Sequence, residues 1–456
     1  MKKMKEQKYW DMDIEPYLNT EKMHQIQSAR LQPMLNFHYR FVPFDRKRMQ
    51  RAGIEPEGIL SFNDLAKALP PVGQAEYRQV YEEKMLDMDA IFEELYGPKR
   101  LENLYMVNST SGTTGIPTPY PLFRVEDPDR IPNINGRMSW RANIRPGDRI
   151  AILFGLSMHA ASTPQILGYQ KFPGITLYPI GAEAGTERIL NYIKWFKINV
   201  FSGTPSLALH LIERSPDVLK EPVRALNMKV LFCGAEPGAG IPEVKSRLEN
   251  EYGAKVYDAG AGYGISCDHP VYQGMHWVAD DYCYYELIDP ETKDPIPLTH
   301  GATGVAVFTS LYPESPGFFP NIRFTLNDIH QVFTEPCPCG LSGFRYKIVG
   351  RADDMLKVKG VPVYPAAIEG VIQSFFPRLT GSFRIVLEEP PPRVVPPLKL
   401  KVEYGESIQE SDRVELEKEI IEKMHQTLKL RPTITWLKPY TLERATKKTQ
   451  LLEKLY

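Results

Sequence analysis

The sequence predicts an α/β protein that carries a small, separate α+β domain at its C-terminal end. Through the middle of the chain, short apolar runs such as 229–233 alternate with amphipathic stretches such as 186–196. Alternation of this kind is typical of α/β units. The composition changes after Gly350-Arg351, and the residues beyond have the pattern strand, helix, strand, interrupted by proline clusters. We therefore expect a body over residues 1–350 and a C-terminal domain over residues 351–456.

The first hundred residues are expected to form a largely helical cap on this body. The polar stretches 21–36 and 74–96 have helical periodicity, and Pro70-Pro71 interrupts the chain between them. The cap is therefore the first predicted element, and the α/β units follow it.

The composition restricts the possible partners. The chain has 456 residues, with 55 Lys plus Arg against 56 Asp plus Glu, so its formal net charge is -1. Without a global basic field, neither nucleic acid nor an anionic membrane is expected as a partner. The five cysteines are too few, and odd in number, for a disulfide framework in so long a chain. Because charged residues rather than an apolar run follow the start, we expect no membrane anchor and a cytoplasmic location.

A loop rich in glycine and hydroxyl residues carries the densest local signal for a ligand. Residues 109–118 read Ser-Thr-Ser-Gly-Thr-Thr-Gly-Ile-Pro-Thr. Small residues let backbone N–H groups and side-chain hydroxyls approach an oxyanion closely, and phosphate is the natural guest. The loop lacks the Gly-Lys-Ser/Thr ending of the P-loop NTPases, so their mechanism is not implied. An ordinary polar loop is the alternative interpretation.

This loop and several later motifs, in the same order along the chain, resemble the phenylacetate–CoA ligase family of the adenylate-forming superfamily. In that family the loop reads Ser-Ser-Gly-Thr-Thr-Gly-Lys-Pro-Thr, whereas Ile116 replaces the lysine here. The resemblance covers nearly the whole chain. It implies a large N-terminal adenylate-forming domain with layered α/β sheets and a small, mobile α+β C-terminal domain. The other motifs that carry the resemblance are Gln27–Gln32, Val42–Phe44, Gly203–Ser206, Gly234–Pro237, Ile322–Asp328 and Gly350–Leu356.

The resemblance implies an ATP-dependent acid–CoA ligase. Such an enzyme first joins a carboxylate to the α-phosphate of ATP, which gives an acyl-adenylate and pyrophosphate, and the CoA thiol then displaces AMP. ATP, Mg²⁺ and CoA are the expected cofactors. The expected acid is aromatic, of the phenylacetate or benzoate type. A homodimer is common among such relatives, and this expectation rests on analogy alone.

Three departures from the family pattern leave other functions open, and one of them is Lys447, which replaces the glycine before the expected adenylation lysine. Ile116 removes a positive charge near the leaving pyrophosphate, and the glutamate that helps to hold Mg²⁺ is replaced by Cys267 or Gly264, depending on the register. Glu236 or Asp268 could substitute for that glutamate. The alternatives are an adenylyltransferase of the same family, which stops at AMP attachment to a cofactor or acid, and a catalytically weakened binding protein.

The resemblance also assigns roles to individual residues. Thr114, Arg351 and Lys448 are the expected catalytic residues. In Ile-Arg-Phe-Thr-Leu-Asn-Asp, which is similar to the family's Ile-Arg-Tyr-Arg-Thr-x-Asp, Asp328 would accept hydrogen bonds from ribose hydroxyls. Asp353 is the expected hinge of the C-terminal domain. The residues expected to contact ATP or CoA are Ser111, Gly112, Thr113, Thr114, Gly115, Gly234, Ala235, Glu236, Pro237, Asp258, Ala259, Tyr263, Asp328, Arg351, Lys359 and Gly360.

Gly234-Ala235-Glu236 follows the predicted strand 229–232, at the edge where open α/β sheets bind ligands, and the resemblance makes it part of the adenine pocket. The acyl pocket is expected between residues 154–159, 202–205 and 259–263. Small residues in this region leave room for a flat acid, and aromatic side chains could pack on its faces. The expected substrate residues are Phe154, Gly155, His159, Gly203 and Tyr263.

The cysteine spacing predicts a second, structural site. Cys337-Pro-Cys339-Gly is a tight turn, and Cys267 lies near His269 and His276 in the sequence. Three thiolates and one imidazole would form a closed tetrahedral zinc site with no position for a catalytic water. Because Gly-Met-His-Trp resembles the family's Gly-Leu-His-Ile-Trp, His276 is the preferred nitrogen ligand and His269 the alternate. Free buried cysteines remain the simpler interpretation.

Overall fold

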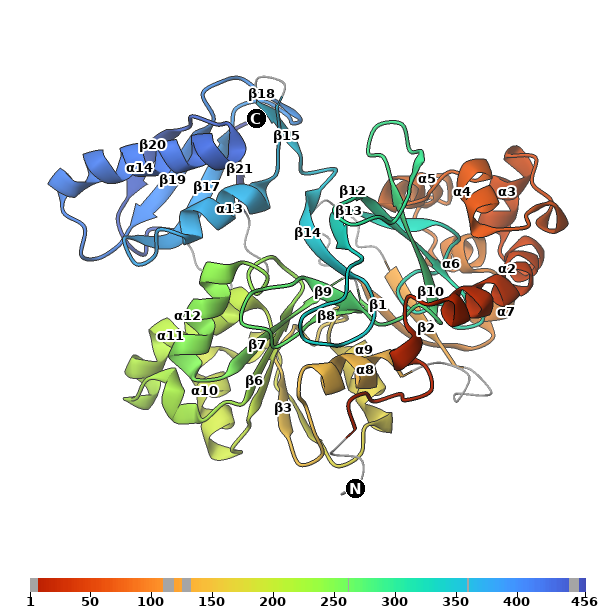
Figure 1. Cartoon of the computed structure of the whole chain (residues 1–456), viewed down its shortest axis with the longest axis horizontal. Helices are drawn as coiled ribbons and strands as arrows, with labels where there is room; N and C mark the ends of the chain where they lie inside the picture. The colour runs from red at the N-terminus through yellow and green to blue at the C-terminus, as the bar shows by residue number, and fades with distance from the viewer. Residues whose placement is uncertain (1–6, 110–118, 125–132, 261, 359–360, 443–450) are drawn as a thin grey trace. The chain divides into compact units, whose positions relative to one another are not determined.

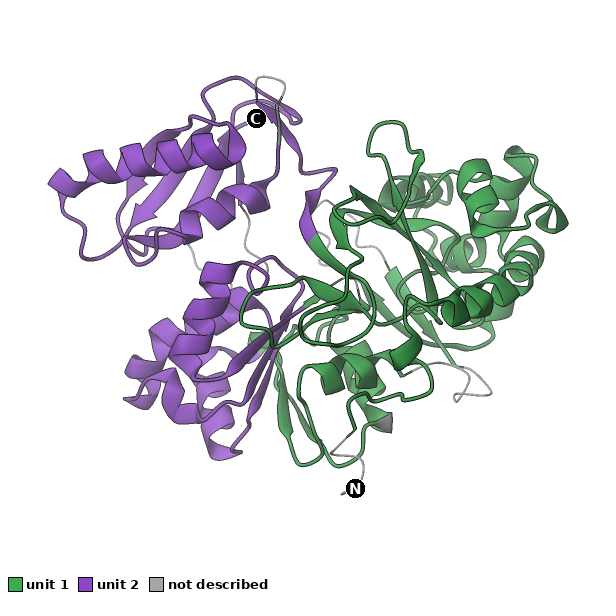
Figure 2. Cartoon of the chain, in the orientation of Figure 1, with its two compact units in different colours: residues 1–183, 259–347 green, residues 184–258, 348–456 purple. Residues whose placement is uncertain are grey.

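The computed structural model describes residues 7–109, 119–124, 133–260, 262–358, 361–442 and 451–456 (Figure 1). The chain divides into two compact units, and each unit is built from two stretches of sequence (Figure 2). Unit 1 contains residues 1–183 and 259–347, and unit 2 contains residues 184–258 and 348–456. The domain boundary predicted after residue 350 and the predicted extent of the cap stay predictions.

Helices form the first part of unit 1, and local hydrogen bonds fix where some of them begin. The Ser61 hydroxyl accepts the Asp64 N–H at the start of α4, and the Asp87 carboxylate accepts two N–H groups at the start of α6. The elements are η1 (Glu15–Tyr17), α2 (Glu21–Phe41), α3 (Pro43–Arg51), η2 (Pro56–Gly58), α4 (Phe62–Ala68), α5 (Gln74–Glu83), α6 (Met88–Tyr96) and α7 (Pro98–Leu101).

A run of neighbouring strands forms the main sheet of unit 1. Their order is β11, β10, β12, β13, β14, β9, β8. Three aromatic rings from this sheet, Trp277, Tyr285 and Phe308, pack with centroids 5.2 to 5.7 Å apart and form part of the core. The strands are β8 (Gly264–Ser266), β9 (Met275–Trp277), β10 (Cys283–Ile288), β11 (Pro295–Ile296), β12 (Thr303–Ser310), β13 (Phe324–Phe333) and β14 (Arg345–Arg351).

The rest of unit 1 contains two smaller strand pairs and the helices beside them. β1 and β2 pair in antiparallel fashion, whereas β3 and β4 are parallel. The elements are β1 (Leu104–Ser109), β2 (Pro119–Phe123), α8 (Ile134–Arg141), β3 (Arg149–Ile152), α9 (Thr163–Gly168), η4 (Tyr169–Lys171), β4 (Thr176–Pro179) and η5 (Ala182–Ala184).

The first stretch of unit 2 is an α/β layer. β5 and β6 are parallel, and all their residues are buried, as expected for strands that are covered on both faces. The predicted strand at 229–233 is confirmed as β6, and the predicted helix at 186–196 as α10. The elements are α10 (Thr186–Trp195), β5 (Val200–Gly203), α11 (Pro205–Leu219), η6 (Val223–Leu226), β6 (Val230–Gly234), α12 (Pro242–Tyr252) and β7 (Lys255–Gly260).

The second stretch of unit 2 has its own apolar core and α+β composition. Side chains such as Ile368, Phe383 and Ile420 are buried between two helices and a four-stranded sheet with the order β20, β19, β17, β21. The predicted α/β body with an α+β C-terminal part is confirmed. The elements are β15 (Leu356–Val358), β16 (Val361–Val363), α13 (Pro365–Gln373), β17 (Leu379–Leu387), β18 (Arg393–Val394), β19 (Lys399–Tyr404), α14 (Glu410–Leu428), β20 (Thr433–Leu437) and β21 (Leu452–Lys454).

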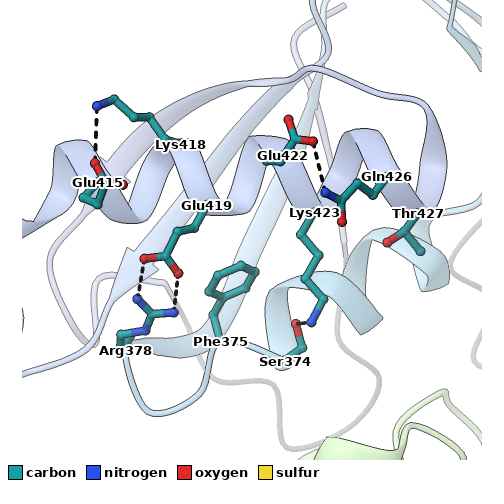
Figure 3. Close-up of a pocket in the computed structure, with 10 residues that line it drawn as sticks. All are labelled: Ser374, Phe375, Arg378, Glu415, Lys418, Glu419, Glu422, Lys423, Gln426 and Thr427. Carbon is teal, nitrogen blue, oxygen red and sulfur yellow. Dashed lines mark hydrogen bonds and ion pairs between the residues drawn. The ribbon is translucent and has the colours of Figure 1, made fainter.

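A groove on this second stretch lies between α14 and the turn that follows α13 (Figure 3). Its charged groups are largely paired with one another: Arg378 binds Glu419 through two hydrogen bonds, and Lys423 donates to the Ser374 hydroxyl. None of the predicted site residues lines this groove. The groove is therefore separate from the predicted site residues.

Among the residues that the structure describes, none of the helices combines the length and the apolar character needed to cross a membrane.

Candidate functional site

Part of the predicted site lies outside the described residues. This holds for the glycine and hydroxyl loop, for the predicted CoA contacts of the C-terminal domain and for the predicted adenylation lysine. The residues concerned are Ser111, Gly112, Thr113, Thr114, Gly115, Lys359, Gly360 and Lys448. Their roles stay predictions.

The segment that leads into the predicted phosphate loop pairs with the predicted acyl loop in unit 1. The Ser109 N–H donates to Met158 O at 2.7 Å, and the Ala160 N–H donates to Ser109 O at 3.2 Å. The ring of His159 stacks on that of Phe154, with centroids 6.3 Å apart and nearly parallel planes. Backbone pairing therefore holds the last residue of β1 beside two predicted substrate residues.

Glu183 supports the same acyl loop and was missed by sequence reasoning. Its Oε1 accepts the Leu156 N–H at 2.8 Å. A Cβ at the predicted substrate residue Gly155 would lie 3.7 Å from Glu183 Oε2, which is an ordinary van der Waals distance. A larger residue than glycine could therefore be accommodated at this position. The sequence offered no signal for Glu183, because the hydrogen bond joins residues 27 positions apart in an irregular region.

Tyr263 lies in a buried aromatic cluster at the start of the β8–β9 hairpin. Its ring contacts those of Trp277, Tyr282 and Phe319, with centroids 5.4 to 5.7 Å away. Burial raises the pKa of the Tyr263 hydroxyl well above its usual value, so the group stays a neutral phenol. An aromatic wall of this kind suits a flat, apolar ligand group.

Gly262 precedes Tyr263 in a position that only glycine fits. Its φ of 72° is left-handed, and a Cβ there would come within 2.8 Å of the Phe318 ring. The neighbouring residue Ala259, at the end of β7, pairs with Ile265 of β8. Packing therefore determines the conformation at Gly262, and strand pairing determines it at Ala259.

Asp328 lies on a bulge of β13 in unit 1. Thr325 pairs with Val307 of β12 and Ile329 pairs with Val305, so three residues of β13 stand opposite the single residue between those partners. The bulged residues, Asp328 among them, are half-buried, whereas those on either side are buried. Burial raises the pKa of the nearby Tyr285 hydroxyl, and the charges of Tyr346 and Asp328 add to this effect. The bulge thus places the Asp328 carboxylate in a half-buried stretch between buried residues of β13.

The predicted adenine loop lies at the carboxyl ends of two parallel strands in unit 2. Gly203 ends β5 and pairs with Cys233, and Gly234 ends β6. Ala235 follows with a φ of 69°, and Glu236 Oε1 accepts the Ser206 N–H at 2.8 Å near the start of α11. The carboxyl edge of a parallel sheet is where such folds bind ligands. The predicted strand-end position of this loop is confirmed.

Two further carboxylates, those of Asp258 and Glu369, interact with residues of this loop or of the strand before it. Asp258 lies at the end of β7, and its charge, with that of Glu236, adds to burial in raising the pKa of the Cys233 thiol. Pro237 continues the loop and is exposed. Glu369, on α13, is half-buried, and burial together with the charge of Glu236 raises its pKa to about 8. Sequence reasoning missed Glu369, because it lies on an ordinary amphipathic helix.

Arg351 and the predicted hinge Asp353 form an ion pair in unit 2. Arg351 Nε and Nη2 donate to the two Asp353 oxygens at 2.9 and 2.7 Å, and Asp354 Oδ2 lies 3.5 Å from Arg351 Nε. Two parallel hydrogen bonds of this kind fix the plane of the guanidinium group. The structure therefore joins two residues to which separate roles were assigned.

Four predicted metal ligands meet in unit 1. Cys267 follows β8, His276 is in β9, and Cys337 and Cys339 are in the turn between β13 and β14. Their ligand atoms all lie within 4.8 Å of one another. Cys267 Sγ is 3.9 Å from Cys337 Sγ, and Cys339 Sγ is 3.4 Å from His276 Nε2. The alternate ligand, His269, instead contacts Val271 and Gln273 outside this cluster.

The surroundings of the cluster suit metal ligation. His276 Nδ1 donates to Ser342 O at 3.0 Å, so Nε2 carries the lone pair that faces the cysteines. Burial lowers the pKa of His276, which keeps the imidazole in its neutral, ligating form. A hydrogen bond from Cys339 lowers the pKa of Cys267 and favours its thiolate, whereas burial raises the pKa of Cys337. Arg141 also donates to Ser342 O, at 2.9 Å, and so helps to hold the carbonyl group that His276 contacts. Three sulfurs and one imidazole fit a structural zinc ion.

Comparison with known proteins identifies relatives over most of the chain. Residues 360–453 match the model of the AMP-binding enzyme C-terminal domain. A phenylacetate-coenzyme A ligase of Thermus thermophilus is 29% identical, with 93% of this chain and 92% of that protein covered. A phenylacetate-coenzyme A ligase of Escherichia coli is 27% identical, with 78% of this chain and 77% of that protein covered.

Solved structures give the same result for the fold. A 2-hydroxyisobutyryl-CoA ligase in the postadenylation state, in complex with R3-HIB-AMP, has a TM-score of 0.84, with 25% identity over 98% of this chain and 93% of that chain. The same kind of ligase with 2-HIB-AMP and CoA, in the thioesterification state, has a TM-score of 0.65, with 26% identity over 98% and 92% of the two chains. With the ordered motifs and the strand-end loop, these relatives show that the chain belongs to the adenylate-forming superfamily, and that the phenylacetate–CoA ligases are homologous to it.

Proposed function

We propose that the protein is an ATP-dependent acid–CoA ligase, which forms an acyl-adenylate and then an acyl-CoA thioester. The observation that carries this proposal is the homology with acid–CoA ligases over 93% of the chain. The expected motifs at Gly234–Pro237 and Asp328 agree with it. The aromatic cluster around Tyr263 supports an aromatic acid of the phenylacetate or benzoate type.

In the first half-reaction the protein mainly positions groups and neutralises charge. We assign the ATP phosphates to the loop Ser111–Gly115, the adenine to Gly234–Pro237, and the ribose hydroxyls to Asp328. Lys448 and Arg351 would stabilise the negative charge that develops as the carboxylate attacks the α-phosphate. Arg351 is held by Asp353, so its guanidinium is already oriented before any ligand binds.

Mg²⁺ is an expected cofactor, but the residues at the family's metal position differ in this chain. The two positions that align with the family's metal-binding glutamate are Cys267 and Gly264, and neither carries an oxygen ligand. Cys267 lies in the sulfur cluster. Of the two suggested substitutes, Glu236 already accepts a hydrogen bond from Ser206, and Asp268 is exposed. The donor set therefore does not fit the family's way of holding the ion.

In the second half-reaction CoA would attack the adenylate. We assign the pantetheine contacts to Lys359-Gly360 and the hinge between the two half-reactions to Asp353. The cytoplasmic location and the homodimer remain predictions of the same kind.

A structural zinc ion would complete the protein. Cys267, His276, Cys337 and Cys339 would hold it, and the ion would supply folding free energy rather than chemistry. The ligands come from the β8–β9 hairpin and from the turn after β13. Zinc would therefore join that turn to the hairpin that begins at Tyr263.

Pyrophosphate release from a panel of carboxylic acids, measured with and without CoA, tests the proposal. A ligase gives an acid-dependent and ATP-dependent signal together with CoA consumption. The same signal without CoA consumption would identify an adenylyltransferase instead. No signal across aromatic and short aliphatic acids would rule out both enzymes and favour a binding protein.

A further inference from the structure

The bulge that carries Asp328 is held open by one hydroxyl group. Thr325 Oγ1 donates to Ala306 O at 2.8 Å, and Ala306 is the residue of β12 that stands opposite the bulge. The same oxygen accepts the Asn327 N–H at 3.0 Å. The hydroxyl therefore replaces the ladder hydrogen bond that β12 and β13 lose at the bulge, and links Ala306 to Asn327.

Asn327 gives the bulge its direction. Its φ of 64° is left-handed, a conformation that asparagine tolerates better than most residues. Because Asp328 is the next residue, the orientation of its backbone depends on this conformation. The hydrogen bond from Asn327 N–H to Thr325 is thus a direct constraint on where the Asp328 carboxylate points.

Thr325 itself is fixed from the opposite side. Its N–H donates to Val72 O at 2.8 Å, and the Val72 N–H donates to Arg323 O at 2.9 Å. A Cβ at Gly73 would lie 3.3 Å from Thr325 Cγ2, so the missing side chain makes room for the threonine methyl group. Thr325 is buried. The methyl group of Thr325 therefore packs against Gly73, and its hydroxyl group makes hydrogen bonds inside the bulge.

We propose that Thr325 is a positioning residue for ATP: its hydroxyl sets the bulge so that Asp328 faces the ribose hydroxyls. The inference rests on the proposed role of Asp328. In the family motif that this segment resembles, arginine stands at the position of Thr325. The hydrogen bonds of the Thr325 hydroxyl are therefore a feature of this chain and not of the family motif. Thr325 touches no reacting atom and acts only through Asp328.

The experiment measures the affinity of the full-length protein for ATP and for 2′,3′-dideoxy-ATP by calorimetry, without acid or CoA. Thr325→Val keeps the shape and the methyl group but removes the hydroxyl, and Thr325→Ser keeps the hydroxyl. Asp328→Ala is the reference for a lost ribose contact. Thermal unfolding of each variant establishes that it is folded before binding is measured.

We expect the wild-type protein to bind ATP about tenfold more tightly than the dideoxy nucleotide, the usual effect of a charged hydrogen-bond acceptor. Thr325→Val should weaken ATP binding by about fivefold to tenfold and leave binding of the dideoxy nucleotide within about twofold of wild type. Thr325→Ser should keep the wild-type ratio between the two nucleotides.

Two results would overturn the inference and are distinct from each other. In the first, Asp328→Ala abolishes the preference for ATP, but Thr325→Val weakens the binding of both nucleotides equally or changes the binding of neither. Thr325 then has only a structural role. If Asp328→Ala keeps the wild-type preference, the ribose assignment of Asp328 fails, and the role of Thr325 fails with it.

Discussion

Gly264 shows how one missing side chain determines the packing beside Tyr263. The Tyr346 hydroxyl donates to Gly260 O at 2.7 Å, and it passes directly over Gly264. A Cβ at Gly264 would overlap this hydroxyl group. The hydrogen bond that joins β14 to the end of β7 therefore needs glycine at this position.

Gly264→Ala should lower the free energy of unfolding by about 1–3 kcal/mol, because an added methyl group must displace a packed tyrosine. Gly58→Ala is the matched control, since a Cβ there meets nothing within 4 Å, and it should change the stability by less than about 0.5 kcal/mol. Urea unfolding of the two variants measures the difference. Equal effects would mean that Tyr346 moves aside without cost.

Glu369 makes part of the stability depend on pH. Its carboxyl has a pKa of about 8 in the folded protein, above the value of 4.5 expected for an exposed glutamate. The folded state therefore holds a proton that the unfolded state releases at lower pH. The stability that this group contributes is fully present below about pH 4.5 and is lost as the pH rises through 8.

Glu369→Gln should remove this dependence, because the amide is neutral at every pH. We expect the melting temperature of the variant to exceed that of the wild type by roughly 2 to 5 °C at pH 8.5 and to match it at pH 5. Calorimetric scans across this range provide the measurement. Glu251→Gln, which changes an exposed glutamate of α12, is the control, and a shift of equal size in both variants would contradict the assignment.

At the scale of elements, the β8–β9 hairpin and the turn after β13 depend on each other. The turn is also tied to the N-terminal segment, because Lys8 Nζ donates to Gly340 O at 2.6 Å and the Ser342 N–H donates to Tyr9 at 3.1 Å. A metal ion at the cysteine cluster would therefore hold three separate segments at one point. Such a site contributes most where few other contacts close the chain.

Elemental analysis of the purified protein should find about one zinc per chain. Replacement of both Cys337 and Cys339 by serine should remove the metal and lower the melting temperature. Cys283→Ala changes a buried thiol outside the cluster and should leave the metal content unchanged. Wild-type protein without zinc, or a double variant that keeps it, would contradict the site.

The elements themselves were predictable because their signals are local. Apolar runs and helical periodicity located β6 and α10, and the short Cys-Pro-Cys spacing located half of the metal cluster. Glu183, Glu369 and Thr325 were not predictable, because their roles depend on partners brought close only by the fold. A bulge in β13 leaves no periodic trace that sequence reasoning could use. Contacts between residues far apart in the sequence leave no local pattern that would predict them.

At the scale of the whole molecule, the near-neutral net charge agrees with an enzyme that handles small anions. The formal charge is -1, so ATP and CoA must be met by local groups rather than by a general field. We assign Arg351 and Lys448 to the α-phosphate of ATP. Loss of either cation should therefore affect the first half-reaction more than the second.

Lys448→Ala should reduce the rate of adenylate formation by about 10²-fold or more, because the charge that develops on the phosphate loses its partner. Thioester formation from supplied acyl-adenylate should change much less. Rapid-quench measurements of the two steps, with Lys454→Ala as the control, make the comparison. An equal loss in both steps would contradict the assigned role.

The interleaved construction of the two units has a consequence for synthesis on the ribosome. Unit 1 needs residues 259–347 and unit 2 needs residues 348–456, although each begins much earlier in the chain. The first stretch of unit 2, which contains β5 and β6, must therefore wait for a stretch made about a hundred residues or more later before the unit is complete. Long-range closure of this kind is slow. The chain should accordingly depend on chaperones during translation more than its size alone would suggest.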